Sequence, residues 1–90
     1  MSDNIMPDNP PWWRNKRFEG SHEHHVFPGA NRLLSDEDGL VVYLTPQQHM
    51  DMHSNKTDYW EYAKREAQKA FETHRGTRND FIARYGKNYL

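Results

Sequence analysis

Five of the six histidines in this 90-residue chain lie between Ser21 and His53, and the chain contains no cysteine. A chain of this length forms one domain and buries a smaller share of its surface than a larger protein does. Only 34% of the residues are hydrophobic, so apolar burial barely exceeds the entropy cost of ordering the chain. Disulfides are excluded, whereas a metal ion bound by imidazoles adds its binding free energy to folding. The histidine-rich segment therefore predicts a metal-stabilised fold.

Two apolar segments flank a turn-rich stretch within this region. Residues 22–27, HEHHVF, and residues 40–45, LVVYLT, contain the β-branched and aromatic side chains that favour strands. Residues 28–39, PGANRLLSDEDG, are rich in Gly, Pro, Asn and Asp, which is typical of a long connection. The pattern predicts a hairpin of two strands joined by a long loop.

The residues that follow the second strand carry a strong signal for the start of a helix. Thr45 at the N-cap, Pro46 at the first helical position and Gln48 at the third together form a capping box. This helix carries His49 and His53, which at a spacing of four lie on one face, about one turn apart.

Two further helices are predicted towards the C-terminus. Residues 54–58, SNKTD, interrupt or bend the helical pattern, and the next helix begins near Asp58. Its apolar stripe consists of Trp60, Ala63, Ala67, Ala70 and Phe71. Thr77 caps a short last helix that ends at Gly86. The buried side of that last helix consists of Phe81, Ile82 and Tyr85.

The order of elements predicts an α+β fold, with a small hairpin-plus-helix core followed by two C-terminal helices. Residues 1–13 contain three prolines, and the stretch up to Pro11 shows no apolar periodicity, as is typical of a flexible N-terminal arm. Residues 14–90 then form a single domain. Trp12 and Trp13 either dock the arm onto this domain, which we favour, or form an exposed stacking surface.

The histidines have the spacing expected of a site for a late first-row divalent metal ion. Such a site needs imidazoles from at least two elements, and His49 and His53 on one helix supply two of them. The third ligand is expected from the first strand, where His22, His24 and His25 are all candidates. Three protein ligands leave one coordination position open to water or a phosphate oxygen, as in catalytic sites.

The same residues resemble a known family. The paired histidines at the end of a first strand, the long loop, the second strand and the histidine-bearing helix resemble the ββα-metal core of the HNH nucleases. His49 follows His25 by 24 residues and is itself followed by His53, which is similar to the nuclease colicins. Residues 21–90 also resemble small phage and prophage proteins of the HNH type, above all in HEHHVFPGANRLLSDEDGLVVYLTPQQH and FIARYGKNYL.

This resemblance implies a metal-dependent DNA endonuclease that nicks or cuts DNA by single-metal phosphodiester hydrolysis. It implies that His24, His49 and His53 bind one divalent ion (zinc, nickel, magnesium or manganese) and that His25 is the general base. The ion would stabilise negative charge on the scissile phosphate and on the departing 3′ oxygen. The expected products carry a 5′ phosphate and a 3′ hydroxyl.

Two features of the chain depart from the family pattern. The zinc-binding cysteine pairs of many HNH proteins have no counterpart here, because the chain has no cysteine. Leu40 or Val41 stands in the region where the middle asparagine of the HNH pattern usually lies. Asn31 is the nearest candidate, and we assign it to positioning of the loop and the base.

The alternation of side chains along a strand leaves open which histidine of the first strand is the third ligand. In a regular strand His22 and His24 share one face, whereas His25 points to the other face. His24 and His25 serve one site only if the strand ends or bulges there, and Pro28 and Gly29 favour such a break. His22 therefore remains an alternative ligand in place of His24.

The formal net charge of -1 argues against a strongly basic nucleic-acid binder, although cations lie near the motif. The cations that we expect to contact DNA phosphates are Arg14, Lys16, Arg17 and Arg32. The longest strongly apolar run, LVVYL, is far shorter than the roughly 20 residues that a membrane-spanning helix needs. We therefore expect no membrane partner and a cytoplasmic location, in the bacterial host cell if the chain is phage-encoded.

A second class of function fits the same residues. The chain is alternatively a non-catalytic, metal-stabilised HNH-like binding module that modulates a host protein or DNA. The slightly acidic charge and the missing middle asparagine favour this alternative. His25 favours the enzyme, because a purely structural metal site has no need of an unligated histidine beside it.

Overall fold

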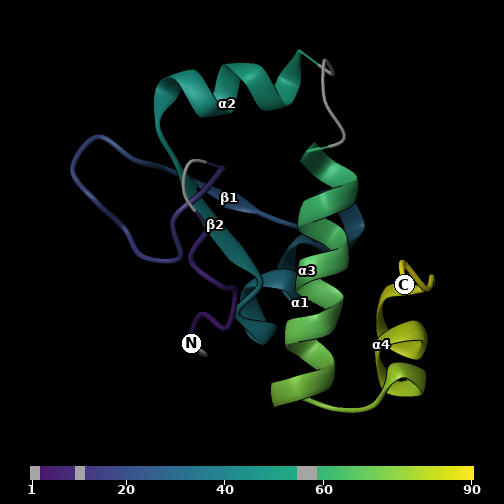
Figure 1. The fold of residues 1–90 in the computed structure, drawn as a ribbon. Coiled ribbons are helices and arrows are strands. Elements are labelled where there is room, and N and C mark those ends of the chain that lie inside the picture. Colours follow the sequence, from purple (N-terminus) through teal and green to yellow (C-terminus); the bar gives the residue numbers. More distant parts are fainter. Residues whose placement is uncertain (1–2, 10–11, 55–58) are drawn as a thin grey trace.

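The computed structural model describes residues 3–9, 12–54 and 59–90 and shows an α+β architecture (Figure 1). Its elements are, in chain order, β1 (His22–His25), the 3-10 turn η1 (Gly29–Asn31), α1 (Arg32–Asp38), β2 (Val41–Leu44), α2 (Pro46–His53), α3 (Tyr59–His74) and α4 (Arg78–Tyr85). Figure 1 shows α2 at one end of the β1–β2 hairpin and α4 beside α3 near the C-terminus.

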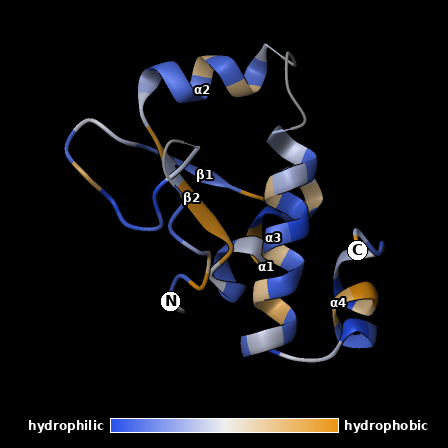
Figure 2. Cartoon of the chain, viewed as in Figure 1, coloured by the Kyte–Doolittle hydropathy of each residue, from blue (hydrophilic) through white to orange (hydrophobic). Residues whose placement is uncertain are grey.

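The two predicted strands are confirmed as an antiparallel pair, with His24 opposite Val42. An extended segment borders the other edge of β2, where the Arg14 and Tyr43 backbones exchange two hydrogen bonds of 2.9 and 2.8 Å. β2 supplies buried side chains to the core, whereas the side chains of β1 are exposed or half-buried. In Figure 2, β2 is hydrophobic, whereas β1 and most of α2 are hydrophilic.

The connection between the strands was predicted to be a long loop, and this was wrong because it contains η1 and α1. Ser35 of α1 is fully buried, and its hydroxyl donates to the Leu40 carbonyl at 2.6 Å and accepts from the Phe27 N–H at 3.3 Å. Gly39 ends α1 in the left-handed region, with a φ of 75°. Buried contacts of this kind override the weak helical preference of the local composition.

The predicted starts of α2 and α4 are confirmed. The Thr45 hydroxyl accepts from the Gln48 N–H at 3.1 Å, and the Gln48 side-chain oxygen accepts from the Thr45 N–H at 2.9 Å. Thr77 and Asp80 form the same reciprocal pair at the start of α4, with distances of 3.1 and 2.8 Å. These caps set the first turn of each helix from residues within the turn.

One face of α3 packs against the core. Four members of the predicted stripe are buried, namely Ala63, Ala67, Ala70 and Phe71, whereas Trp60 is partly buried. Phe71 meets Phe81 of α4 edge-on, with ring centroids 5.4 Å apart. The predicted helix start near Asp58 and the interruption before it lie outside the described residues, apart from Ser54. Within the ranges described, no helix combines the length and the apolar character needed to cross a membrane.

The described part of the N-terminal segment packs on the domain. Met6 and Trp13 are buried in the core, and the Ile5 N–H donates to the Gly39 carbonyl at 2.8 Å. Trp12, in contrast, is 41% exposed. The proline-rich composition predicts a flexible arm, whereas the structure docks this segment, because Met6 and Trp13 add apolar area to a thin core.

Candidate metal centre

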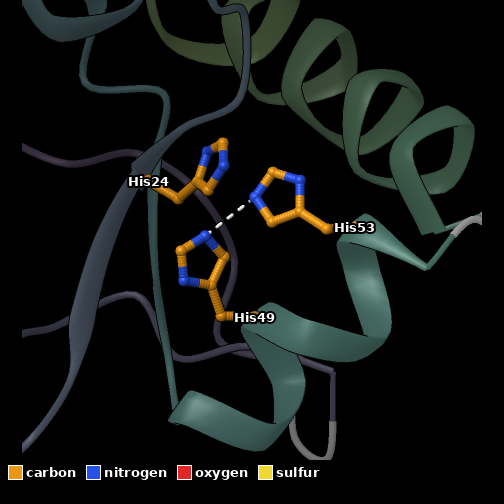
Figure 3. A group of neighbouring side chains, drawn as sticks. All are labelled: His24, His49 and His53. Carbon is orange, nitrogen blue, oxygen red and sulfur yellow. Dashed lines mark hydrogen bonds between the residues drawn. The ribbon is translucent and has the colours of Figure 1, made fainter.

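Three imidazoles converge at the hairpin end of the molecule. His24 comes from β1, and His49 and His53 come from α2; we call these three residues the histidine cluster (Figure 3). One ring nitrogen from each residue lies within 4.8 Å of the others, and Nε2 of His49 lies 2.9 Å from Nε2 of His53. A set of three imidazole nitrogens from two elements suits a late first-row divalent ion.

Hydrogen bonds outside the cluster select which nitrogen of His24 and of His49 faces the other rings. Nδ1 of His24 lies 3.0 Å from the His25 carbonyl, to which it donates, so Nε2 is left as the ligand atom. Nδ1 of His49 lies 2.8 Å from Nδ1 of His22, while Nε2 of His49 faces His53. The cluster therefore presents Nε2 atoms from all three rings.

The surroundings of His24 and His49 favour the neutral form of these two rings. Burial lowers the pKa of His24, and the neighbouring His49 and His53 lower it further. Burial likewise lowers the pKa of His49, with added contributions from His53 and His22. Trp60 contributes to the burial of His24, because the two ring centroids lie 4.8 Å apart. Neutral imidazoles have the free lone pair that metal binding requires.

His25 lies on the opposite side of β1, as strand alternation predicts. Its Nε2 is 3.4 Å from Oδ1 of Asp36 in α1. Glu23 on the same face pairs with Arg17 at 2.7 Å. Glu23, His25 and Asp36 also form a group with ligand atoms within 4.8 Å of one another. Glu23 already has a guanidinium partner and Asp36 an imidazole partner, so we assign the His25–Asp36 contact to positioning of the ring.

A solvent-open cleft at the end of β1 brings both faces of the strand together. It has a volume of about 280 Å³, and its walls are formed by Glu23, His24, His25, Pro28, Arg32 and His49. His25 is the last residue of β1, and the chain turns at Gly29 with a φ of 67°. The predicted base and two of the three predicted ligands therefore share one cavity with a guanidinium.

The cations predicted to contact DNA are distributed over three places. Arg32 is exposed and lines the cleft beside His25. Arg14 and Lys16 line a separate groove of about 600 Å³, which also borders the first turn of α2. The Arg17 guanidinium pairs with Glu23. Of these four cations, Arg32 alone adjoins the histidine cluster.

Asn31 does not join the cleft. Its side-chain amide donates to the Tyr85 carbonyl at 3.5 Å, so it faces α4. Leu40, which stands in the region where the resemblance to HNH proteins predicts an asparagine, is fully buried in the core. Sequence reasoning missed Asp36 as the neighbour of His25, because residue 36 lay in a stretch interpreted as a loop. The alternation of side chains in the sequence HEH of β1 did indicate that His22 lies on the same face as His24.

The chain was compared with models of protein families, with curated proteins and with solved structures, and no match was found. The residues of the cleft and their geometry are therefore the basis for assigning a function.

Proposed function

We propose that this chain is a metal-dependent DNA endonuclease of the HNH-like type, which hydrolyses a phosphodiester bond with a single divalent ion. The observation that carries the proposal is the cleft at the end of β1. There the ligand candidates His24 and His49 lie beside His25 and Arg32. Hydrolysis of a phosphodiester needs an ion site, a proton acceptor and a cation for the phosphate, and these residues supply one of each.

Each side chain has a distinct role in this proposal. His25 accepts the proton of the attacking water, because an imidazole exchanges protons near neutral pH without strong tuning. Asp36, at 3.4 Å from its Nε2, holds the ring and stabilises the imidazolium as it forms. Arg32 binds phosphate oxygens through its planar guanidinium.

The histidine cluster would hold the divalent ion. A bound ion supplies Lewis-acid stabilisation of the negative charge on the phosphate and on the departing 3′ oxygen. Three imidazole nitrogens favour zinc or nickel by affinity, whereas magnesium and manganese prefer oxygen ligands. Affinity alone does not select the ion that supports turnover, so the test compares all four.

A second candidate is a non-catalytic, metal-stabilised module that binds a host or phage protein or DNA. The buried Leu40 favours it, because the family's middle asparagine is absent from that region. Asn31 also favours it, because its amide is engaged with α4. In this candidate His25 is only a neighbour of the Asp36 carboxylate, with no part in a reaction.

The deciding experiment measures nicking of supercoiled plasmid by metal-stripped protein after addition of magnesium, manganese, nickel or zinc. The proposal predicts that wild type cleaves with at least one ion. His25→Ala should cleave more slowly by a factor of about 100 or more, because it lacks the general base. His74→Ala is the matched control, since His74 ends α3 and does not line the cleft. It should cleave like wild type.

The two candidate functions predict different results. Metal-dependent cleavage that is lost in a folded His25→Ala protein supports the endonuclease. If wild type binds metal and remains folded but cleaves with none of the four ions, the endonuclease is rejected in favour of the binding module. Equal losses in His25→Ala and His74→Ala would contradict the role of His25.

A further inference from the structure

We infer that His22 is a positioning residue of the candidate metal centre, which holds the His49 ring so that its Nε2 faces the ion. The inference rests on the metal-binding part of the proposed function and is independent of cleavage. Its basis is the contact between the two rings, whose Nδ1 atoms lie 2.8 Å apart and whose planes are perpendicular. At that distance one nitrogen donates and the other accepts.

The direction of this hydrogen bond follows from the opposite side of the His49 ring. Nε2 of His49 lies 2.9 Å from Nε2 of His53, inside the histidine cluster. A nitrogen that binds a metal ion carries no proton, so the proton of neutral His49 lies on Nδ1. The His49 Nδ1–H therefore donates to Nδ1 of His22, and His22 carries its own proton on Nε2.

The same geometry places His22 outside the ligand set. The two nitrogens of one imidazole point in divergent directions, and His22 and His53 occupy opposite sides of His49. An ion at Nε2 of His49 therefore lies on the side away from His22. His24, in contrast, belongs to the group whose ligand atoms lie within 4.8 Å of one another. Of the two alternatives on β1, His24 is the ligand and His22 is the orienting group.

Strand geometry explains why one strand supplies both groups. His22 and His24 are two residues apart in β1, so both face α2. His24 is itself oriented by a backbone carbonyl, that of His25. Nδ1 of His49 instead has a side-chain partner from β1. Such outer partners commonly change metal affinity by about 10- to 100-fold when they are removed.

The test compares His22→Leu with His22→Asn. The asparagine Oδ1 can take the place of the ring Nδ1 and accept from His49, whereas leucine cannot accept. We would titrate metal-stripped protein with cobalt(II) alone, measure affinity by competition with a chromophoric chelator, and record the visible absorption bands of the bound ion. We expect His22→Leu to bind cobalt(II) about 10- to 100-fold more weakly with altered bands, and His22→Asn to resemble wild type.

The outcomes separate this inference from the proposed function. If wild type binds no cobalt(II), the metal centre and the proposed endonuclease both fail. If wild type and both variants bind alike, only the role of His22 is rejected. Equal loss in both variants also rejects it, because the ring itself would then be required, as for a direct ligand. His22 is exposed, so neither variant removes core packing, and circular dichroism of the metal-free proteins checks the fold.

Discussion

Two clusters of ionisable side chains in this molecule differ in the kind of partner that each side chain has. In the Asp38 cluster, the buried Asp38 carboxylate accepts from Arg84 Nε at 2.6 Å and from the Tyr85 hydroxyl at 2.6 Å. In the histidine cluster, only imidazoles face one another, and no carboxylate pairs with these rings in the part of the chain that the structure describes. The first cluster is complete within the chain, whereas the second presents three imidazole nitrogens in an arrangement that suits a metal ion.

The pKa shifts follow the same contrast. The hydrogen bond from Arg84 to Asp38 raises the pKa of the guanidinium, which therefore keeps its charge. Burial raises the pKa of the Tyr85 hydroxyl, and its hydrogen bond to Asp38 adds to this effect. In the histidine cluster, burial and like neighbours lower the pKa of His24 and His49. Arg84 in the structural cluster thus keeps its charge, whereas His24 and His49 in the candidate ligand set favour the neutral imidazole.

The largest expected effect on stability comes from breaking the Asp38 cluster. Asp38→Ala should lower the free energy of unfolding of the metal-free protein by about 3 kcal/mol, because Arg84 and Tyr85 both lose their acceptor. Urea denaturation measures this change. Glu37→Ala is the matched control, since Glu37 also binds Arg84, at 2.8 Å, but its side chain is 65% exposed.

The control variant should change stability by less than about 0.5 kcal/mol, because exposed ion pairs contribute little. Cobalt(II) affinity should be unchanged in both variants, since neither residue belongs to the histidine cluster. Equal destabilisation by the two substitutions would show that burial does not distinguish the two carboxylates.

A somewhat smaller effect is expected from metal addition. An ion that binds only the folded state should raise the free energy of unfolding by about 2.7 kcal/mol at a concentration of 100 times its Kd. Urea melts with and without zinc test this in wild type, Asp38→Ala and His53→Ala. Asp38→Ala should keep the full increase, whereas His53→Ala should lose most of it at the same zinc concentration. Equal responses in the two variants would remove the distinction between the clusters.

The smallest expected effect is the pH dependence of the metal-free protein. The pKa values of His24 and His49 in the folded protein lie below the ordinary histidine value of about 6.5, so the unfolded chain binds more protons in the window just below that value. Their contribution to stability is therefore full above about pH 6.5 and is lost as the pH falls towards the lowered folded values. Urea melts at a series of pH values should show this decline.

A double variant, His24→Asn with His49→Asn, sharpens this prediction. It should show a weaker decline than wild type, because the two shifted imidazoles are absent. Asp38→Ala should keep the contribution of the histidines, since these rings do not contact the Asp38 cluster. An unchanged decline in the double variant would assign the pH dependence to other groups.

Features that depend on neighbouring residues could be predicted from the sequence. The capping boxes at Thr45 and Thr77 join atoms three residues apart, so the starts of α2 and α4 are encoded locally. The left-handed Gly86 ends α4 for a similarly local reason. Strand alternation separated His24 from His25, and the structure confirms opposite faces.

Features that depend on distant contacts were missed. α1 is a short helix whose composition also suits a loop, and its last residue, Asp38, accepts hydrogen bonds from Arg84 and Tyr85, 46 and 47 residues away. The docking of Met6 escaped prediction for the same reason, because its neighbours lie far along the chain. Local propensity is weak compared with such burial.

The sequence by itself determined which residues are the candidates for a metal site: the histidine pair at a strand end, and His49 and His53, which the helix period places on one face. Only the tertiary structure decided how these groups meet. It docks α2 against one face of β1 and α1 near the other, which brings Asp36 to His25 and Arg32 into the cleft. The packing of separate elements against one another sets these positions, and no local period specifies it.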